Sequence, residues 1–147
     1  MRSLTIPGKP LGKQRPRVLK SGITYTPKKT VNYETLVRML YIEKYTCAKP
    51  FTGPVCMLIR AYYQIPKSAS KKRKKAMREQ NILPTIRPDV DNIIKIIADA
   101  LNGLAYDDDK QIVSCCFSKF YSDTPRAEVD IMGAGSEKTL LEEAMLT

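Results

Sequence analysis

Carboxylate side chains gather in two short segments of a chain that is otherwise basic. The first segment contains Asp89 and Asp91, the second is the run 107–109, and Lys95 lies between them. Like charges repel one another, so this grouping indicates a counter-charge such as a bound divalent cation. Carboxylate oxygens suit a hard ion, Mg²⁺, or Mn²⁺ in its place. A cation held in a basic protein points to a phosphodiester substrate.

The absence of histidine from the chain narrows the chemistry further. Neither a Ser-His-Asp nor a Cys-His nucleophile system can be built without that residue. General base catalysis then falls to a carboxylate, a lysine or a metal-bound water. The four cysteines form no CxxC pair, which argues against a structural zinc site and for reduced thiols.

The chain carries a formal net charge of +10 and has a pI near 9.5. Such a balance favours a polyanionic partner, nucleic acid first and an anionic membrane surface second. Basic residues collect before Glu34, the first acid of the chain, and again in the run 67–78. The lysine-rich part of that run, 71–75, is either a solvated helix surface or a phosphate-contacting arm. The residues predicted to contact nucleic-acid phosphates are Lys13, Arg15, Arg17, Lys71, Lys72 and Arg73.

The length of 147 residues is typical of one domain with a hydrophobic core of its own. No apolar run approaches the roughly 20 residues that a membrane helix needs. The N-terminus also lacks the long apolar stretch of a signal peptide. A cytoplasmic location without membrane association is therefore expected.

The hydrophobic pattern predicts an α+β domain. Strands are predicted over 2–6, 55–65, 112–121 and 127–132, the last two around a turn at 122–125, with a hairpin at 18–26. Helices are predicted over 31–46, from Ser68 or Ser70 to about Gln80, and from about Asp91 to Asn102. The apolar face of the first helix is predicted to comprise Val31, Tyr33, Leu36, Met39, Leu40 and Ile42.

The helix that follows Asp89 has the clearest periodicity in the chain. On a helix, Asp89 and Asp91 would diverge and could not share an ion, whereas in an extended segment they point the same way. Pro88 favours extended backbone before it, so the helix is expected to begin at or just after Asp91, with that residue near the N-cap. Lys95 then lies one turn further along. Asp99 lies two turns from Asp91, roughly 12 Å along the axis, which is too far to share a ligand.

A D-x-D motif by itself is a weak signal. Either aspartate of the motif also suits a helix cap, and the run 107–109 suits a polar turn. The motif occurs in phosphatase nucleophile loops too, but those need a threonine or serine four residues after the first aspartate, where this chain has Ile93. Sugar-nucleotide sites with this motif usually belong to larger chains. Two alternatives to a nuclease stay open: a non-catalytic basic nucleic-acid-binding protein, and a phosphatase or transferase for small phosphoesters.

Several stretches of the chain resemble the RusA family of Holliday junction resolvases, which are typically of phage or prophage origin. The central resemblance is R-P-D-V-D-N-I-I-K at 87–95, D-A-L-N-G at 99–103 and D-D-K-Q-I at 108–112. The front of the chain is similar to the basic N-terminal segment of the family, with P-G-K-P at 7–10, K-Q-R-P-R at 13–17 and Y-T-P at 25–27. The resemblance ends near Met132, and the lysine run 71–75 has no counterpart.

The resemblance implies a RusA-like endonuclease domain over 1–132, with a mixed β-sheet packed against two to three helices. The acidic segment 133–147 would be a helical or mobile tail. In function it implies a Mg²⁺-dependent homodimer, encoded by a bacterium or a phage and active in DNA recombination and repair. Each subunit would nick one of two opposed strands of a four-way DNA junction.

The resemblance also assigns roles to single residues. Asp89, Asp91 and Asp109 match the catalytic, metal-binding aspartates, and Lys95 matches the lysine that acts at the phosphate. Asp108 is the uncertain neighbour of Asp109, because a turn of three aspartates leaves the register open; it is expected to lie outside the ligand set.

Overall fold

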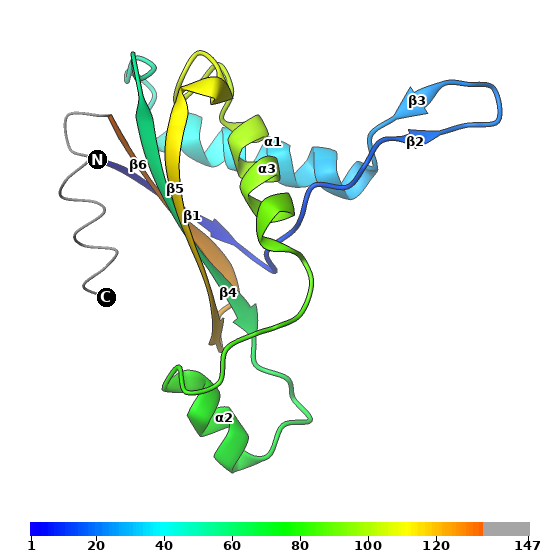
Figure 1. Ribbon diagram of the computed structural model, residues 1–147, viewed down its shortest axis with the longest axis vertical. Coiled ribbons are helices and arrows are strands. Elements are labelled where there is room, and N and C mark those ends of the chain that lie inside the picture. The colour runs from blue at the N-terminus through cyan, green and yellow to red at the C-terminus, as the bar shows by residue number, and fades with distance from the viewer. Residues whose placement is uncertain (134–147) are drawn as a thin grey trace.

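The computed structural model describes residues 1–133, and they form an α+β domain built on a mixed four-stranded sheet (Figure 1). This confirms the predicted fold class; the expected tail from residue 134 onward lies outside the described residues. In chain order the elements are β1 (Arg2–Pro7), β2 (Arg17–Val18), β3 (Thr24–Tyr25), α1 (Lys28–Lys44), β4 (Val55–Gln64), α2 (Lys71–Arg78), α3 (Val90–Ala100), the 3-10 helix η1 (Asp109–Gln111), β5 (Ile112–Ser122) and β6 (Arg126–Gly133).

Strand β4 lies inside the sheet, whose order is β1-β6-β4-β5. It pairs in parallel with β5 and antiparallel with β6, so Ile59 lies between Phe117 and Val129. The turn at 122–125 therefore does not close a hairpin: it carries the chain across the end of β4. Nothing local distinguishes the two cases, because the same turn residues suit both. The strand predicted over 55–65 is thus the central strand β4, and six of its ten residues are buried.

Helices α1 and α3 cover one face of the sheet (Figure 1). The inward stripe of α3 is fully buried, at Ile93, Ile96 and Ile97. Each such side chain contributes about 1.5–3 kcal/mol relative to an exposed one. The stripe thereby fixes the rotation of α3 on the sheet, and its polar residues must face away from the core.

The apolar face predicted for the helix at 31–46 is only partly correct. Helix α1 buries Thr30, Tyr33, Val37 and Tyr41, whereas Val31, Met39 and Ile42 are exposed. Two of these buried residues are tyrosines: Tyr41 Oη accepts a hydrogen bond of 2.8 Å from Arg2, whereas the Tyr33 hydroxyl is itself buried. A pattern of strictly apolar residues could not reveal such a face.

Two basic elements project from this core. The β2–β3 arm extends to one side of the sheet and helix α2 lies beyond one end of it (Figure 1). Ser70 is the N-cap of α2, since its hydroxyl oxygen accepts from the backbone N–H of Arg73 at 3.3 Å. Within residues 1–133, none of the helices has the length and apolar character needed to cross a membrane.

Candidate active site

Helix α3 begins one residue earlier than predicted. Its N-cap is Asp89, in extended conformation with φ −71° and ψ 155°, and Asp91 lies in the first helical turn. The expectation of a start at or after Asp91 was wrong, because only Asp89 is extended between Pro88 and the first helical residue, Val90. The Asp89 side chain makes no capping hydrogen bond, so its carboxylate is available for other contacts. The partial positive charge of the helix N-terminus favours both carboxylates there.

Contacts from two distant segments hold this helix start in place. The Tyr63 hydroxyl donates a hydrogen bond of 3.0 Å to the carbonyl oxygen of Pro88, and the backbone N–H of Lys13 donates one of 2.8 Å to that of Asn92. At Gly12 the chain passes so close that an added Cβ would lie 2.8 Å from Cβ of Pro88. Burial, and then the negative charge of Asp89, raise the pKa of Tyr63 to about 12. The start of α3 is therefore a fixed frame rather than a loose end.

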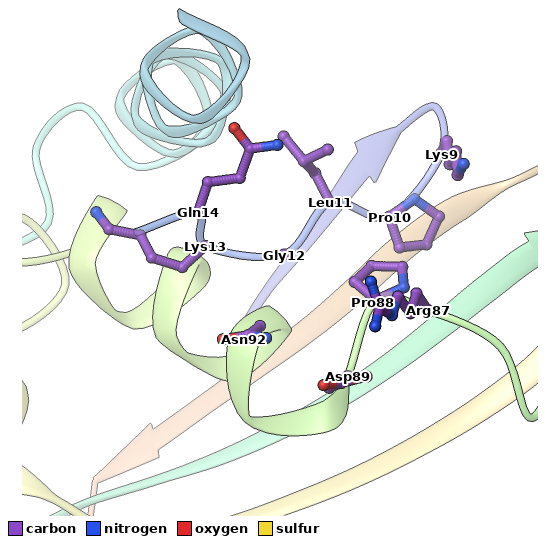
Figure 2. Close-up of a pocket in the computed structure, with 10 residues that line it drawn as sticks. All are labelled: Lys9, Pro10, Leu11, Gly12, Lys13, Gln14, Arg87, Pro88, Asp89 and Asn92. Atoms are coloured by element: carbon purple, nitrogen blue, oxygen red, sulfur yellow. The ribbon is translucent and has the colours of Figure 1, made fainter. Parts of the chain in front are cut away.

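A cavity of about 360 Å³ opens beside this helix start. Figure 2 shows its lining, which combines the loop 9–14 with the segment that leads into α3. Two prolines and a leucine supply apolar walls, while Lys9, Arg87 and Asp89 supply charges. The lining residues are Lys9, Pro10, Leu11, Gly12, Lys13, Gln14, Arg87, Pro88, Asp89 and Asn92.

A second charged group lies further along α3, around Lys95. The Lys95 ammonium lies 2.9 Å from Oδ1 of Asp99 and 3.6 Å from Oδ2 of Asp109. The hydrogen bond to Asp99 raises the pKa of Lys95. Asp109 thus comes close to the predicted catalytic lysine. Asp99, which was expected to lie outside the cluster, is the closest carboxylate that Lys95 contacts; the i, i+4 spacing of this pair was the signal available in the sequence.

Lys13 joins the same group from the N-terminal loop. Its ammonium lies 3.3 Å from Oδ2 of Asp99 and forms a short contact with Glu34 of α1. Partial burial would lower the pKa of Lys13, but hydrogen bonds to Glu34 and Asp99 outweigh it and raise that pKa. No sequence signal links these residues, which are far apart in the chain.

Neighbouring aspartates of the acidic turn make different contacts. Asp108 caps η1, because its Oδ1 accepts from the backbone N–H of Lys110 at 2.9 Å. In the other direction, the backbone N–H of Asp108 donates to Oε1 of Gln111 at 3.1 Å. That bond from Lys110 lowers the pKa of Asp108. Asp109 instead faces Lys95. The D-x-x-Q pattern at 108–111 is a capping box that the sequence alone could have shown.

The predicted metal ligands fit a hard cation in donor type. Asp89 and Asp91 lie in succession at the start of α3, and Asp109 lies beside Lys95, one turn beyond Asp91. Over residues 1–133, no three histidine, cysteine, aspartate or glutamate side chains come together as a ready cage. Magnesium needs no such cage, since it usually binds one or two carboxylates, waters and substrate phosphates.

The residues predicted to contact phosphates occupy three places. Arg15 and Arg17 are exposed where the chain enters the β2–β3 arm. Lys71, Lys72 and Arg73 are exposed in the first turn of α2. Lys13 differs from both groups, because its ammonium is held by two carboxylates.

Comparison with known proteins agrees with the motifs. The family model described as "Endodeoxyribonuclease RusA" matches residues 7–132. A protein of Bacillus subtilis (strain 168) described as "Uncharacterized protein YqaN" is 40% identical over 132 residues, which cover 86% of this chain and 92% of the relative. The matched region spans both charged groups along α3, the acidic turn and the basic arm.

Proposed function

This chain belongs to the RusA family of endodeoxyribonucleases, and we propose that it is a metal-dependent nuclease that resolves four-way DNA junctions by paired, symmetric nicks. Its place would be DNA recombination and repair in the cytoplasm of a bacterial cell. The observation that carries the proposal is the exposed carboxylate pair Asp89 and Asp91 beside the Lys95 group, in a chain of net charge +10.

Asp89, Asp91 and Asp109 would hold Mg²⁺, or Mn²⁺ in its place. When bound, the ion supplies a more acidic water and neutralises charge at the scissile phosphate. The side chains of the protein supply the rest. Lys95 presents a point charge that stabilises negative charge as it develops on the phosphate oxygens. The Tyr63 hydrogen bond to Pro88 holds the backbone immediately before Asp89, at the N-terminal end of α3.

The DNA would be held by the basic elements on either side of this site. Arg15 and Arg17 at the arm, and Lys71, Lys72 and Arg73 on α2, are free of ion pairs among the described residues. Their contacts would position the backbone without reading sequence. Lys13 reaches a phosphate only by leaving Glu34 and Asp99, so its contribution to DNA binding should be smaller.

The enzyme should act as a homodimer, because a junction with two-fold symmetry needs two symmetric cuts and each chain offers one site. Two elements rich in apolar residues are candidates for the interface, strand β4 and helix α1. Strand β4 is paired on both edges, whereas α1 exposes Val31, Met39 and Ile42. We place the interface on α1. Met39→Lys should then yield monomers in sedimentation, whereas Val113→Lys, at an exposed apolar residue of β5, should not.

The test of function is incubation with a labelled four-way junction and a linear duplex of the same sequence, each with and without Mg²⁺. The expected result is paired nicks in the junction only, lost when the metal is chelated. Binding of both DNAs without cleavage under any metal would favour a non-catalytic nucleic-acid-binding protein. Hydrolysis of small phosphoesters without DNA cleavage would favour a phosphatase.

A further inference from the structure

Asp99 contacts two lysines at once, each through a different oxygen. Its Oδ1 accepts a hydrogen bond from Lys95 at 2.9 Å, and its Oδ2 lies 3.3 Å from the ammonium of Lys13. Its side chain is 22% exposed, against 56% for Lys95. An exposed lysine on a flexible stem loses rotamer freedom when it is held in one position. Asp99 is the group that holds it.

The position of Asp99 is itself fixed by its surroundings. Lys13 is tied to α3 through its backbone bond to Asn92 and to α1 through Glu34. The carboxylate that anchors Lys95 is therefore itself anchored on its other side.

We propose that Asp99 is a positioning residue of the nuclease: it holds the Lys95 ammonium beside Asp109, and the Lys13–Glu34 pair holds Asp99. The inference rests on the proposed function, in which Lys95 acts at the phosphate. Because both oxygens of Asp99 face ammonium groups, this carboxylate serves the lysine and is distinct from the ligand set. Lys13 then belongs to the active-site framework rather than to the DNA-binding surface.

The test is a double-mutant cycle with Asp99→Asn, Lys95→Ala and the two combined. Nicking of pre-bound junction is measured under single-turnover conditions, with junction affinity measured separately. Asp99→Asn should slow nicking between about 10-fold and 100-fold, the cost of misplacing a catalytic group, with affinity unchanged. In the Lys95→Ala background the same change should add nothing. Asp99→Glu, which keeps a carboxylate, should restore part of the rate and guards against a folding defect in Asp99→Asn.

Two further measurements separate this role from its alternatives. The proton–nitrogen signal of the Lys95 ammonium, observable when the group is held, should vanish in Asp99→Asn and persist in Glu43→Gln, a matched exposed acid on α1. An additive effect of Asp99→Asn in the Lys95→Ala background, together with weaker Mn²⁺ binding, would show that Asp99 is a ligand and overturn the proposal. If the unmodified protein nicks no branched DNA, the proposed function fails, and the lysine signal still decides whether Asp99 holds Lys95.

Discussion

The carboxylates at the start of α3 and those around its second half differ in whether they form ion pairs. At the N-terminal end, Asp89 and Asp91 are exposed and make no ion pair with any residue in 1–133. Around the second half, Asp99 of α3 and Asp109 of η1 are each in contact with Lys95, and Asp99 with Lys13 as well. The first pair of carboxylates has no ammonium partner, whereas the second group is already paired with lysines.

This difference assigns separate tasks to the two halves. Uncompensated carboxylates at a fixed helix start are suited to take a cation, because no internal pair must break first. A network of paired charges is suited to hold one ammonium in position, because its carboxylates already have ammonium partners before DNA arrives. If this division is correct, substitutions of Asp89 and Asp91 should remove catalysis without affecting folding, and substitution of Asp99 should only slow it. Asp109 contacts Lys95 but is also a proposed ion ligand, so its substitution should behave like those of the first pair.

The largest effect is expected in the open half. Asp89→Asn and Asp91→Asn keep the side-chain shape and remove one negative charge, so nicking should fall by at least about 10²-fold. Junction affinity should stay equal or rise, because a negative charge near the phosphates is lost. The thermal midpoint should fall only slightly, since no ion pair is broken and the favourable interaction with the helix N-terminus is worth under about 1 kcal/mol at an exposed position.

A matched control is Asp107→Asn, which removes a carboxylate from the exposed start of the acidic turn. It should leave nicking within a few-fold of the unmodified protein. Full nicking by both α3 variants, measured beside this control, would end the metal-nuclease interpretation.

The next effect contrasts two neighbours in the acidic turn. Asp109→Asn should abolish nicking, because it removes a carboxylate that lies beside Lys95 and is proposed to help hold the ion. Asp108→Asn should keep partial activity, because an asparagine oxygen can still cap η1. Gel assays of junction cleavage compare the two directly, and the opposite order of activity would mean that the register assigned to the turn is wrong.

Features that depend on residues close together in the chain could be predicted from the sequence. The apolar stripe of α3, the cap at Ser70 and the burial of β4 all follow from local periodicity or local hydrogen bonds. The insertion of β4 between β5 and β6 could not be read, because it depends on pairing between distant strands.

The site divides in the same way. Asp89, Asp91 and Lys95 lie on a single segment, and their motif was visible in the sequence. The contacts of Lys13 with Glu34 and Asp99 join the N-terminal loop, α1 and α3. Neither the composition nor the spacing of these residues predicts them. Reasoning along one helix also placed Asp99 correctly relative to Asp91, yet missed that Lys95 links it to Asp109.

A smaller effect tests whether the basic arm serves both halves of the site through DNA binding alone. Arg15→Ala with Arg17→Ala should weaken binding to all branched DNA, and should reduce the slope of log affinity against log salt by about 0.9 for each lost phosphate contact. Lys71→Ala with Lys72→Ala removes the same charge from α2 and shows whether that helix touches DNA. An unchanged slope in the arginine variant would mean that the arm makes no phosphate contact.

The smallest effect compares two tyrosines, one at each end of α3. Tyr63→Phe removes the hydroxyl that donates to Pro88 at 3.0 Å, and Tyr106→Phe removes the one that donates to Ala98 at 2.6 Å. Each lost bond should cost about 1 kcal/mol of unfolding free energy. For a chain of this size, that corresponds to a fall of roughly 2–4 °C in thermal midpoint.

The two variants should differ in activity although their stabilities match. Pro88 precedes Asp89, so loosening it should slow nicking a few-fold. Ala98 is held by its own helix as well, and Lys95 keeps its contacts with Asp99 and Asp109 when the Tyr106 hydroxyl is lost. Tyr106→Phe should therefore nick at the normal rate. Equal losses of rate in both variants would show that nicking follows general stability and that the open half of α3 has no special need of its frame.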